Sequence, residues 1–125
     1  MTRVTFLKSG REITLAAAGH AGYRDGEDIV CSAVSILGFT LMNRLERFGM
    51  GDRLDVFYEP GRLEVTARPE ETDRERIEGV FETILTGYDL LAQSYPAHVT
   101  LERREANDGK GSCLLYTSPS PRDTR

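Results

Sequence analysis

Apolar and polar residues alternate in two separate parts of the chain. Near the start, the alternation covers 4–8 and 13–15 on either side of a turn at 9–11. A period of two bounded by turn residues predicts a β-hairpin. The same alternation recurs over 54–58 and 63–67, around a Pro-Gly turn. The chain therefore carries two predicted hairpins, one at its start and one in its middle.

Two longer segments change to the three-and-four spacing of a helix. The first begins at Asp28, a suitable N-cap, and its apolar stripe comprises Val30, Ala33, Val34, Leu37, Leu41, Leu45 and Phe48. The second begins with capping-box spacing at 72–75 and continues to about Ser94, with a stripe of Ile77, Val80, Phe81, Ile84, Tyr88 and Leu91. Alternation around 99–101 predicts a last short strand.

The predicted order is therefore ββαββα with a final β. Strands that alternate apolar with polar residues bury one face of a sheet, and helices with a single apolar stripe cover that face. We expect an α+β fold, a two-layer sandwich in which both helices pack on one face of a mostly antiparallel sheet.

The character of the chain changes after about residue 106. A linker-like run at 107–112 precedes a Ser/Pro-rich end without periodicity, which is typical of disorder. The segment 113–123 also resembles a translated adapter or vector end. We predict one folded domain over 1–106 and a disordered, non-native tail over 107–125, which leaves Cys31 as the single cysteine of the domain.

Composition and charge narrow the function. The chain has 125 residues and a formal net charge of −4, which argues against a broad basic surface for nucleic acid. The amino terminus lacks the apolar region of a secretory signal, and no stretch approaches the roughly 20 apolar residues of a membrane helix. We expect a cytoplasmic protein without direct nucleic-acid or membrane contact.

One histidine and one cysteine are placed where they can meet. The first hairpin ends near Gly19, and the helix beginning near Asp28 must return over the sheet from the same end, so His20 and Cys31 lie at one end of the molecule. A helix N-terminus and an imidazolium both lower the pKa of a thiol, and free helix N–H groups suit a developing oxyanion. These are the parts of a cysteine protease or acyl-transfer site.

Other residues nearby have both a functional and a structural interpretation. Asp28, three residues before Cys31, would either orient His20 or only cap the helix. Ser35, four residues after Cys31, would either bond the thiolate or fill a polar gap. Taken alone, Cys31 is also consistent with a core residue and His20 with an exposed loop residue.

Competing site chemistries fit the spacing poorly. A tyrosine-phosphatase loop needs Arg six positions after the cysteine, where this chain has Leu37. A structural zinc site needs about four N or S ligands, and a redox pair needs a second nearby thiol. The sequence predicts neither a metal nor a cofactor.

The segments Gly19-His20-Ala21-Gly22-Tyr23 and Gly26-Glu27-Asp28-Ile29-Val30-Cys31-Ser32-Ala33-Val34-Ser35 resemble the signature of the ribosomal-processing cysteine proteases, Prp. The resemblance extends over about residues 2–105. It implies that His20 is the general base and Cys31 the nucleophile, that Asp28 and Ser35 support the site, and that Gly19, Gly22 and Gly26 belong to a flap loop. Ser32 departs from the alanine that is more common in the family.

The resemblance also implies a function. The expected protein is a homodimeric endopeptidase that removes the N-terminal extension of a bacterial large-subunit ribosomal protein during ribosome maturation, with the ribosomal protein precursor as substrate. The alternative is a non-catalytic ribosome-assembly or protein-binding module, in which Cys31 is a core residue. A metal-dependent hydrolase is a third, weaker hypothesis.

Overall fold

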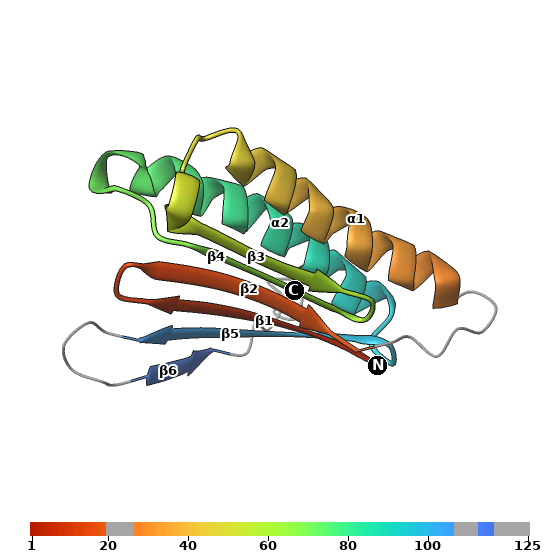
Figure 1. Ribbon diagram of the computed structural model, residues 1–125. Helices are drawn as coiled ribbons and strands as arrows, with labels where there is room; N and C mark the ends of the chain where they lie inside the picture. The colour runs from red at the N-terminus through yellow and green to blue at the C-terminus, as the bar shows by residue number, and fades with distance from the viewer. Residues whose placement is uncertain (20–26, 107–112, 117–125) are drawn as a thin grey trace.

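The computed structural model describes residues 1–19, 27–106 and 113–116, with only the backbone described at 27, 28, 106 and 113–116. The strands and helices follow the predicted order, with one additional strand at the end (Figure 1). In chain order they are β1 (Thr2–Ser9), β2 (Glu12–Ala18), α1 (Glu27–Glu46), the 3₁₀ turn η1 (Gly51–Arg53), β3 (Leu54–Glu59), β4 (Arg62–Ala67), the 3₁₀ turn η2 (Glu71–Asp73), α2 (Arg74–Ser94), β5 (Val99–Ala106) and β6 (Cys113–Tyr116).

The sheet has the order β3-β4-β2-β1-β5-β6. The two hairpins pair antiparallel within themselves and through β2 and β4, whereas β1 and β5 run parallel. Both helices lie on the same face of this sheet (Figure 1). The predicted fold class, a two-layer α+β sandwich with a mostly antiparallel sheet, is confirmed.

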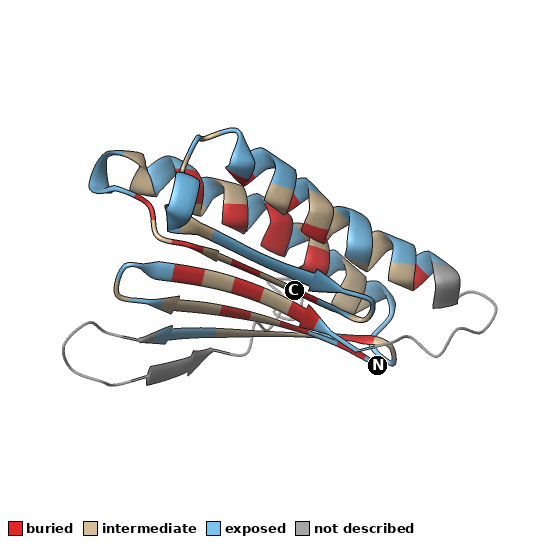
Figure 2. Ribbon diagram, viewed as in Figure 1, coloured by how far each residue is buried: buried red, intermediate tan, exposed pale blue. Residues whose placement is uncertain are grey.

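The hydrophobic core lies between the helices and the sheet (Figure 2). Each central strand buries alternate residues, as period-two side chains require, and α2 contributes the larger helical share. The fully buried side chains of greatest volume are Tyr88, Phe81, Ile13, Leu15, Leu41, Leu45, Ile77, Leu85, Val4, Val30, Val65 and Val99.

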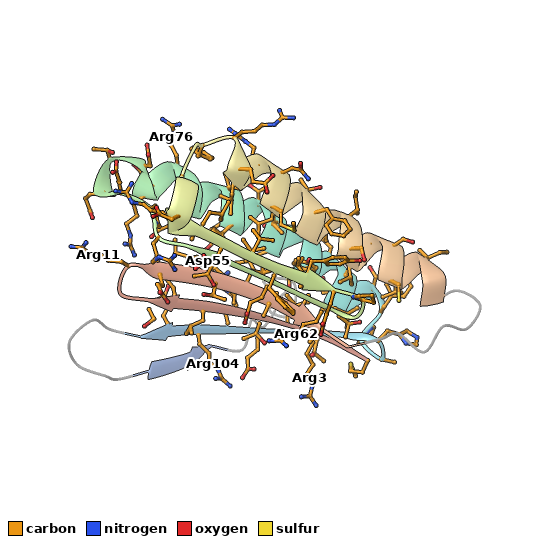
Figure 3. All side chains as sticks on the ribbon, in the orientation of Figure 1. Arg3, Arg11, Asp55, Arg62, Arg76 and Arg104 are labelled. Carbon is orange, nitrogen blue, oxygen red and sulfur yellow. The ribbon has the colours of Figure 1, made fainter. Side chains whose placement is uncertain are left out.

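The opposite face of the sheet is open and polar. Arg3, Arg62 and Arg104 project from it, away from the helices (Figure 3). Glu102 pairs with Arg104 at 3.2 Å, and Thr14 and Thr66 share a hydrogen bond of 3.1 Å across two strands. This face therefore carries both signs of charge, without a basic patch among these residues.

Two helix starts differ from the sequence expectation. Helix α1 begins at Glu27, so Asp28 is its second residue and not its N-cap. Before α2, the segment predicted as a capping box instead forms η2, and the N-cap Asp73 makes no side-chain capping bond. Both predicted helix starts were therefore wrong by one residue or more. For α2 the reason is that a 3₁₀ turn forms the first bonds in place of a side-chain cap.

The end of the chain also differs from expectation. The predicted boundary at residue 106 coincides with the end of β5, but Cys113–Tyr116 adds β6 antiparallel to β5. This short strand pairs with the edge of β5, as an open sheet edge allows. The division into a folded domain over 1–106 and a disordered, non-native tail over 107–125 stays a prediction.

Helix α1 contains a longer apolar stretch than the sequence analysis predicted. Over Ile29–Glu46 it is long and apolar enough to cross a membrane by length and composition alone, contrary to the expectation that no stretch approaches this limit. A core helix passes the same test, and α1 buries Val30, Leu41 and Leu45 in the core.

Candidate active site

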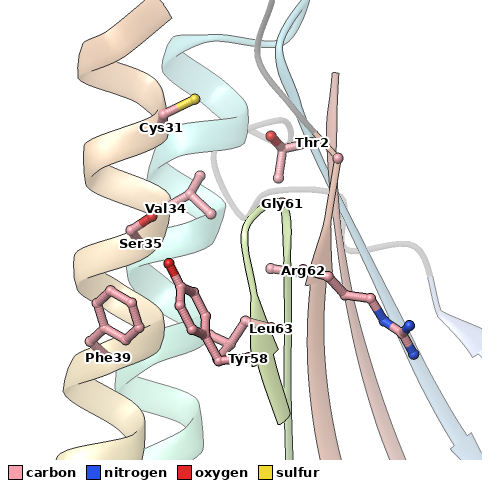
Figure 4. Close-up of a pocket in the computed structure, with 11 residues that line it drawn as sticks. Thr2, Cys31, Val34, Ser35, Phe39, Tyr58, Gly61, Arg62 and Leu63 are labelled. Atoms are coloured by element: carbon pink, nitrogen blue, oxygen red, sulfur yellow. The ribbon is translucent and has the colours of Figure 1, made fainter.

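A pocket opens between the first half of α1 and the turn that joins β3 to β4 (Figure 4). Its volume is about 120 Å³. Three parts of the chain form its walls: the amino-terminal strands, α1 and the second hairpin. The lining residues are Thr2, Ala17, Gly19, Cys31, Val34, Ser35, Phe39, Tyr58, Gly61, Arg62 and Leu63.

Cys31 places a free thiol in the wall of this pocket. Because α1 begins at Glu27, Cys31 opens the second helical turn, and residues 27–30 are those whose amide N–H groups have no acceptor within the helix. The side chain is partly buried, and its sulfur points from α1 toward the space before the sheet (Figure 4). The thiol is therefore accessible from the pocket.

Gly19 brings the end of β2 to the same pocket. Its N–H donates to the carbonyl oxygen of Gly61 at 2.9 Å, and its φ of 115° is a conformation that favours glycine. A Cβ at this position would collide with the carbonyl oxygen of Met1. Gly19, which directly precedes His20, is therefore held between Met1 and the turn of the second hairpin.

The position of α1 beside the pocket is set by contacts with α2 and β4. The Tyr88 hydroxyl, buried in the core, donates to the Val34 carbonyl oxygen at 2.9 Å. Burial raises the pKa of Tyr88 above its ordinary value, so this hydroxyl stays a donor. Gly38 lies so close to Leu63 that a Cβ would overlap its side chain. The absence of a side chain at Gly38 allows this close approach.

The predicted site residues fall into two groups. Cys31 and Gly19 line one pocket, together with Ser35, which is exposed and lies one turn after Cys31. Asp28 lies in the first turn of α1, where its backbone alone is described. His20, Gly22 and Gly26 lie outside the described residues.

Sequence reasoning missed the part of the pocket contributed by the second hairpin. Tyr58 and Leu63 are direct partners across that hairpin, and the Tyr58 ring contacts the Phe39 ring with centroids 5.1 Å apart. Thr2 was missed as well. The turn at Tyr58-Glu59-Pro60-Gly61 could have located this wall of the pocket from the sequence. A strand that follows α1 and runs antiparallel to it ends near the start of α1, so the turn after that strand lies close to Cys31.

The described side chains hold no group of three or more His, Cys, Asp and Glu residues that could bind a metal ion. Arg62 lines the pocket, but its guanidinium extends away from it (Figure 4). Among the described residues that line the pocket, Cys31 supplies a thiol, and Thr2, Ser35 and Tyr58 supply hydroxyls. A thiol is intrinsically the stronger nucleophile, so the pocket favours attack by sulfur.

Comparison with known proteins identifies the class. The family profile described as cysteine protease Prp matches residues 1–100, a range that contains β1 to α2 and every residue lining the pocket. The protein is a cysteine protease, and hence a hydrolase. The chain belongs to the Prp family of cysteine proteases. No curated protein matches it.

Solved structures share the fold. The protein SMU.848 from Streptococcus mutans is 30% identical, with 84% of this chain and 95% of that chain covered and a TM-score of 0.65. The essential ribosomal processing protease Prp from S. aureus, in complex with a covalently linked product peptide, is 22% identical, with coverage of 82% and 99% and a TM-score of 0.65. The same S. aureus protease has been solved with a substrate peptide, at 21% identity.

Proposed function

We propose that the protein is an endopeptidase in which Cys31 is the nucleophile and His20 the general base. The observation that carries the proposal is the shared pocket: Cys31 lines it from α1, and Gly19, the residue before His20, lines it from the end of β2. The chain therefore reaches Gly19, directly before His20, at the edge of the space that the thiol faces. Membership of a cysteine protease family supports the same assignment.

In the proposed reaction, His20 takes the proton of the Cys31 thiol, and the sulfur attacks the scissile carbonyl carbon. The tetrahedral intermediate collapses as the C–N bond breaks, and the imidazolium gives its proton to the departing amine. Water, deprotonated by His20, then hydrolyses the thioester and releases the sulfur. Amide N–H groups at the start of α1 stabilise the oxyanion. Asp28 and Ser35 take supporting roles.

The proposed substrate is the precursor of a bacterial large-subunit ribosomal protein, from which the enzyme removes the N-terminal extension during ribosome maturation in the cytoplasm. The S. aureus relative of the same fold is a ribosomal processing protease that binds a substrate peptide. The resemblance of the Gly-His and Asp-Ile-Val-Cys segments to the Prp signature supports the same substrate class.

A cleavage assay tests the proposal. A synthetic peptide spanning the junction between extension and mature protein is incubated with the enzyme, and the products are identified by mass spectrometry. We expect Cys31→Ala to abolish cleavage and His20→Ala to slow it by about 10²–10⁴-fold. Ser32→Ala is the matched control, since Ser32 neighbours Cys31 but lies outside the pocket lining. Cleavage that survives Cys31→Ala contradicts the proposal.

We further propose that the enzyme is a homodimer. Ile29 and Ile36 lie seven residues apart on α1 and are 63% and 61% exposed, which is an apolar surface beyond what the single chain buries. Sedimentation equilibrium of the wild type measures the association, and Ile36→Glu is expected to weaken it. A wild-type protein that stays monomeric at high micromolar concentration contradicts this assignment.

A further inference from the structure

The pocket beside Cys31 is too small to hold a peptide. Its volume is about 120 Å³, below the roughly 300–1,000 Å³ of pockets that enclose a small ligand. A peptide that places its scissile bond at Cys31 therefore extends beyond this pocket over the neighbouring surface. Extended peptides are commonly held by addition to a free sheet edge.

Strand β3 is a sheet edge that reaches this pocket. It is the first strand in the sheet order and pairs with β4 alone among the described strands. Its last residues lead into the hairpin turn that lines the pocket, where Tyr58 and Cys31 are both wall residues. The other end of the sheet is β6, which lies across the sheet from this hairpin (Figure 1).

Two hydrogen bonds at the ends of β4 determine which main-chain groups of β3 point outward. The N–H of Arg68 donates to the oxygen of Arg53, and the oxygen of Gly61 accepts from β2's end at Gly19. The main-chain N–H and C=O groups of successive residues point to opposite sides of a strand. The groups of even-numbered β4 residues therefore bond to β3, and those of odd-numbered β4 residues bond to β2. The register pairs those even residues with 55, 57 and 59. The N–H and C=O groups of Leu54, Val56 and Tyr58 thus face the free edge.

The side chains of this edge are unusually apolar. Val56, Phe57 and Tyr58 are consecutive and are 37%, 42% and 54% exposed. Natural edge strands are often blunted by Lys or Pro or by an inward charge, whereas the strand sequence Leu-Asp-Val-Phe-Tyr-Glu has neither Lys nor Pro. Asp55 is paired with Arg68 at 2.8 Å. The edge is suited to receive another strand.

We propose that the free edge of β3 binds the main chain of the substrate as an added β-strand and leads it past Tyr58 to the Cys31 pocket. The inference rests on the proposed function, since it names how that site holds its peptide. The outward groups of Val56 and Tyr58 supply main-chain hydrogen bonds. One substrate side chain enters the pocket, and alternate side chains lie along the α1 side of the strand.

The first experiment removes one outward N–H. Val56→Pro deletes a donor that points away from β4, so the β3–β4 ladder keeps its bonds, and proline is tolerated at edge positions of this kind. We expect the KM for the junction peptide to rise about fivefold to tenfold, which corresponds to one net hydrogen bond. The rate of Cys31 alkylation by iodoacetamide should not change. Val56→Ala keeps the N–H and also loses the valine side chain, so the difference in KM between Val56→Pro and Val56→Ala isolates the contribution of the N–H.

The second experiment alters the peptide and needs no variant of the edge. Junction peptides carrying a single N-methyl amide at successive positions are tested for binding to the Cys31→Ala protein. Pairing with β3 predicts that every second N-methyl group weakens binding about fivefold or more and that those between do not. The N-methyl series still tests the edge proposal if circular dichroism shows that Val56→Pro does not fold.

The outcomes separate the two proposals. Absence of Cys31-dependent cleavage by the wild type overturns the proposed function. Cleavage by the wild type, with an unchanged KM for folded Val56→Pro or an N-methyl profile without a period of two, overturns the edge proposal alone. If Val56→Pro changes the sedimentation of the protein and leaves KM unchanged, the edge belongs to a second copy of the chain, and the substrate proposal is wrong.

Discussion

The two helices cover the same face of the sheet but use their apolar residues differently. Helix α2 buries five side chains, from Ile77 to Tyr88, in the core. Helix α1 is the more apolar helix by composition, yet it buries Val30, Leu41 and Leu45 and leaves Ile29 and Ile36 exposed. Neither Ile29 nor Ile36 lines the pocket, so the apolar surface that α1 does not bury is separate from the site of Cys31. Helix α1 thus holds more apolar residues than the core and the pocket use.

The comparison predicts that a truncation in α2 has the largest effect on stability. Phe81 is fully buried, and its ring lies 5.9 Å from that of Phe6 on β1. Phe81→Ala should cost about 3–5 kcal/mol, because it removes buried apolar surface and leaves a cavity between the layers. Chemical denaturation measures this loss. Leu90→Ala, on the exposed side of α2, should change stability by less than about 1 kcal/mol. Equal losses at both positions would contradict the assignment of α2 as the scaffold helix.

The scaffold was predictable from the sequence to a greater extent than the site. Local periodicity predicts both hairpins and the apolar stripe of α2. The residues that an element buries recur every two positions in a strand and every three or four in a helix, so a short stretch of sequence reveals them. The parallel pairing of β1 with β5 joins residues nearly 100 positions apart, and no local pattern contains that information. The predicted apolar stripe of α1 also faces the core: Val30, Leu41 and Leu45 are buried, and Val34 and Leu37 pack against the core half-buried.

The position of the pocket, though not the roles of its residues, follows from segments that are close in sequence. The thiol of Cys31 and the residue next to His20 meet at one pocket, as the topology of one hairpin and one helix implied. Tyr58 and Thr2 were missed because they reach the pocket through strand pairings distant in sequence. The close approach at Gly38 was missed for a similar reason: a glycine within a helix is not distinctive until its neighbour, Leu63, is known.

Two helical glycines give the second prediction. An alanine at Gly38 in α1 would overlap Leu63, whereas a Cβ at Gly79 in α2 meets nothing within 4 Å. Gly38→Ala should destabilise the protein by about 1–3 kcal/mol through overpacking and lower activity, because Leu63 lines the pocket. Gly79→Ala should stabilise it by about 0.5–1 kcal/mol. Thermal unfolding and the cleavage assay measure both, and a stabilised Gly38→Ala protein would show that α1 is free to shift.

The bond between the helices gives the third prediction. Tyr88→Phe removes the hydrogen bond to the Val34 carbonyl and should cost about 0.5–1.5 kcal/mol of unfolding free energy.

The pH dependence of stability gives a second readout of the same hydroxyl. The pKa of Tyr88 is raised in the folded state and is about 10 in the unfolded chain. The contribution is therefore fully present below pH 10 and is lost as the pH rises above it. Urea denaturation between pH 8 and 11 should show a smaller alkaline loss for Tyr88→Phe than for the wild type. Identical profiles would contradict the role of this hydroxyl.

The smallest expected effect comes from the exposed isoleucine of α1. Ile36→Ser replaces a side chain that is 61% exposed, so the free energy of unfolding should change by about 0.5 kcal/mol or less. Ile84 of α2 is 6% exposed, and Ile84→Ser should cost well over 2 kcal/mol, because it creates a cavity and buries a hydroxyl. Denaturation at low protein concentration keeps association out of the measurement. A large loss for Ile36→Ser in the monomer would mean that α1 needs this apolar side chain for its own packing. The excess of apolar residues on α1 would then have a structural and not a functional origin.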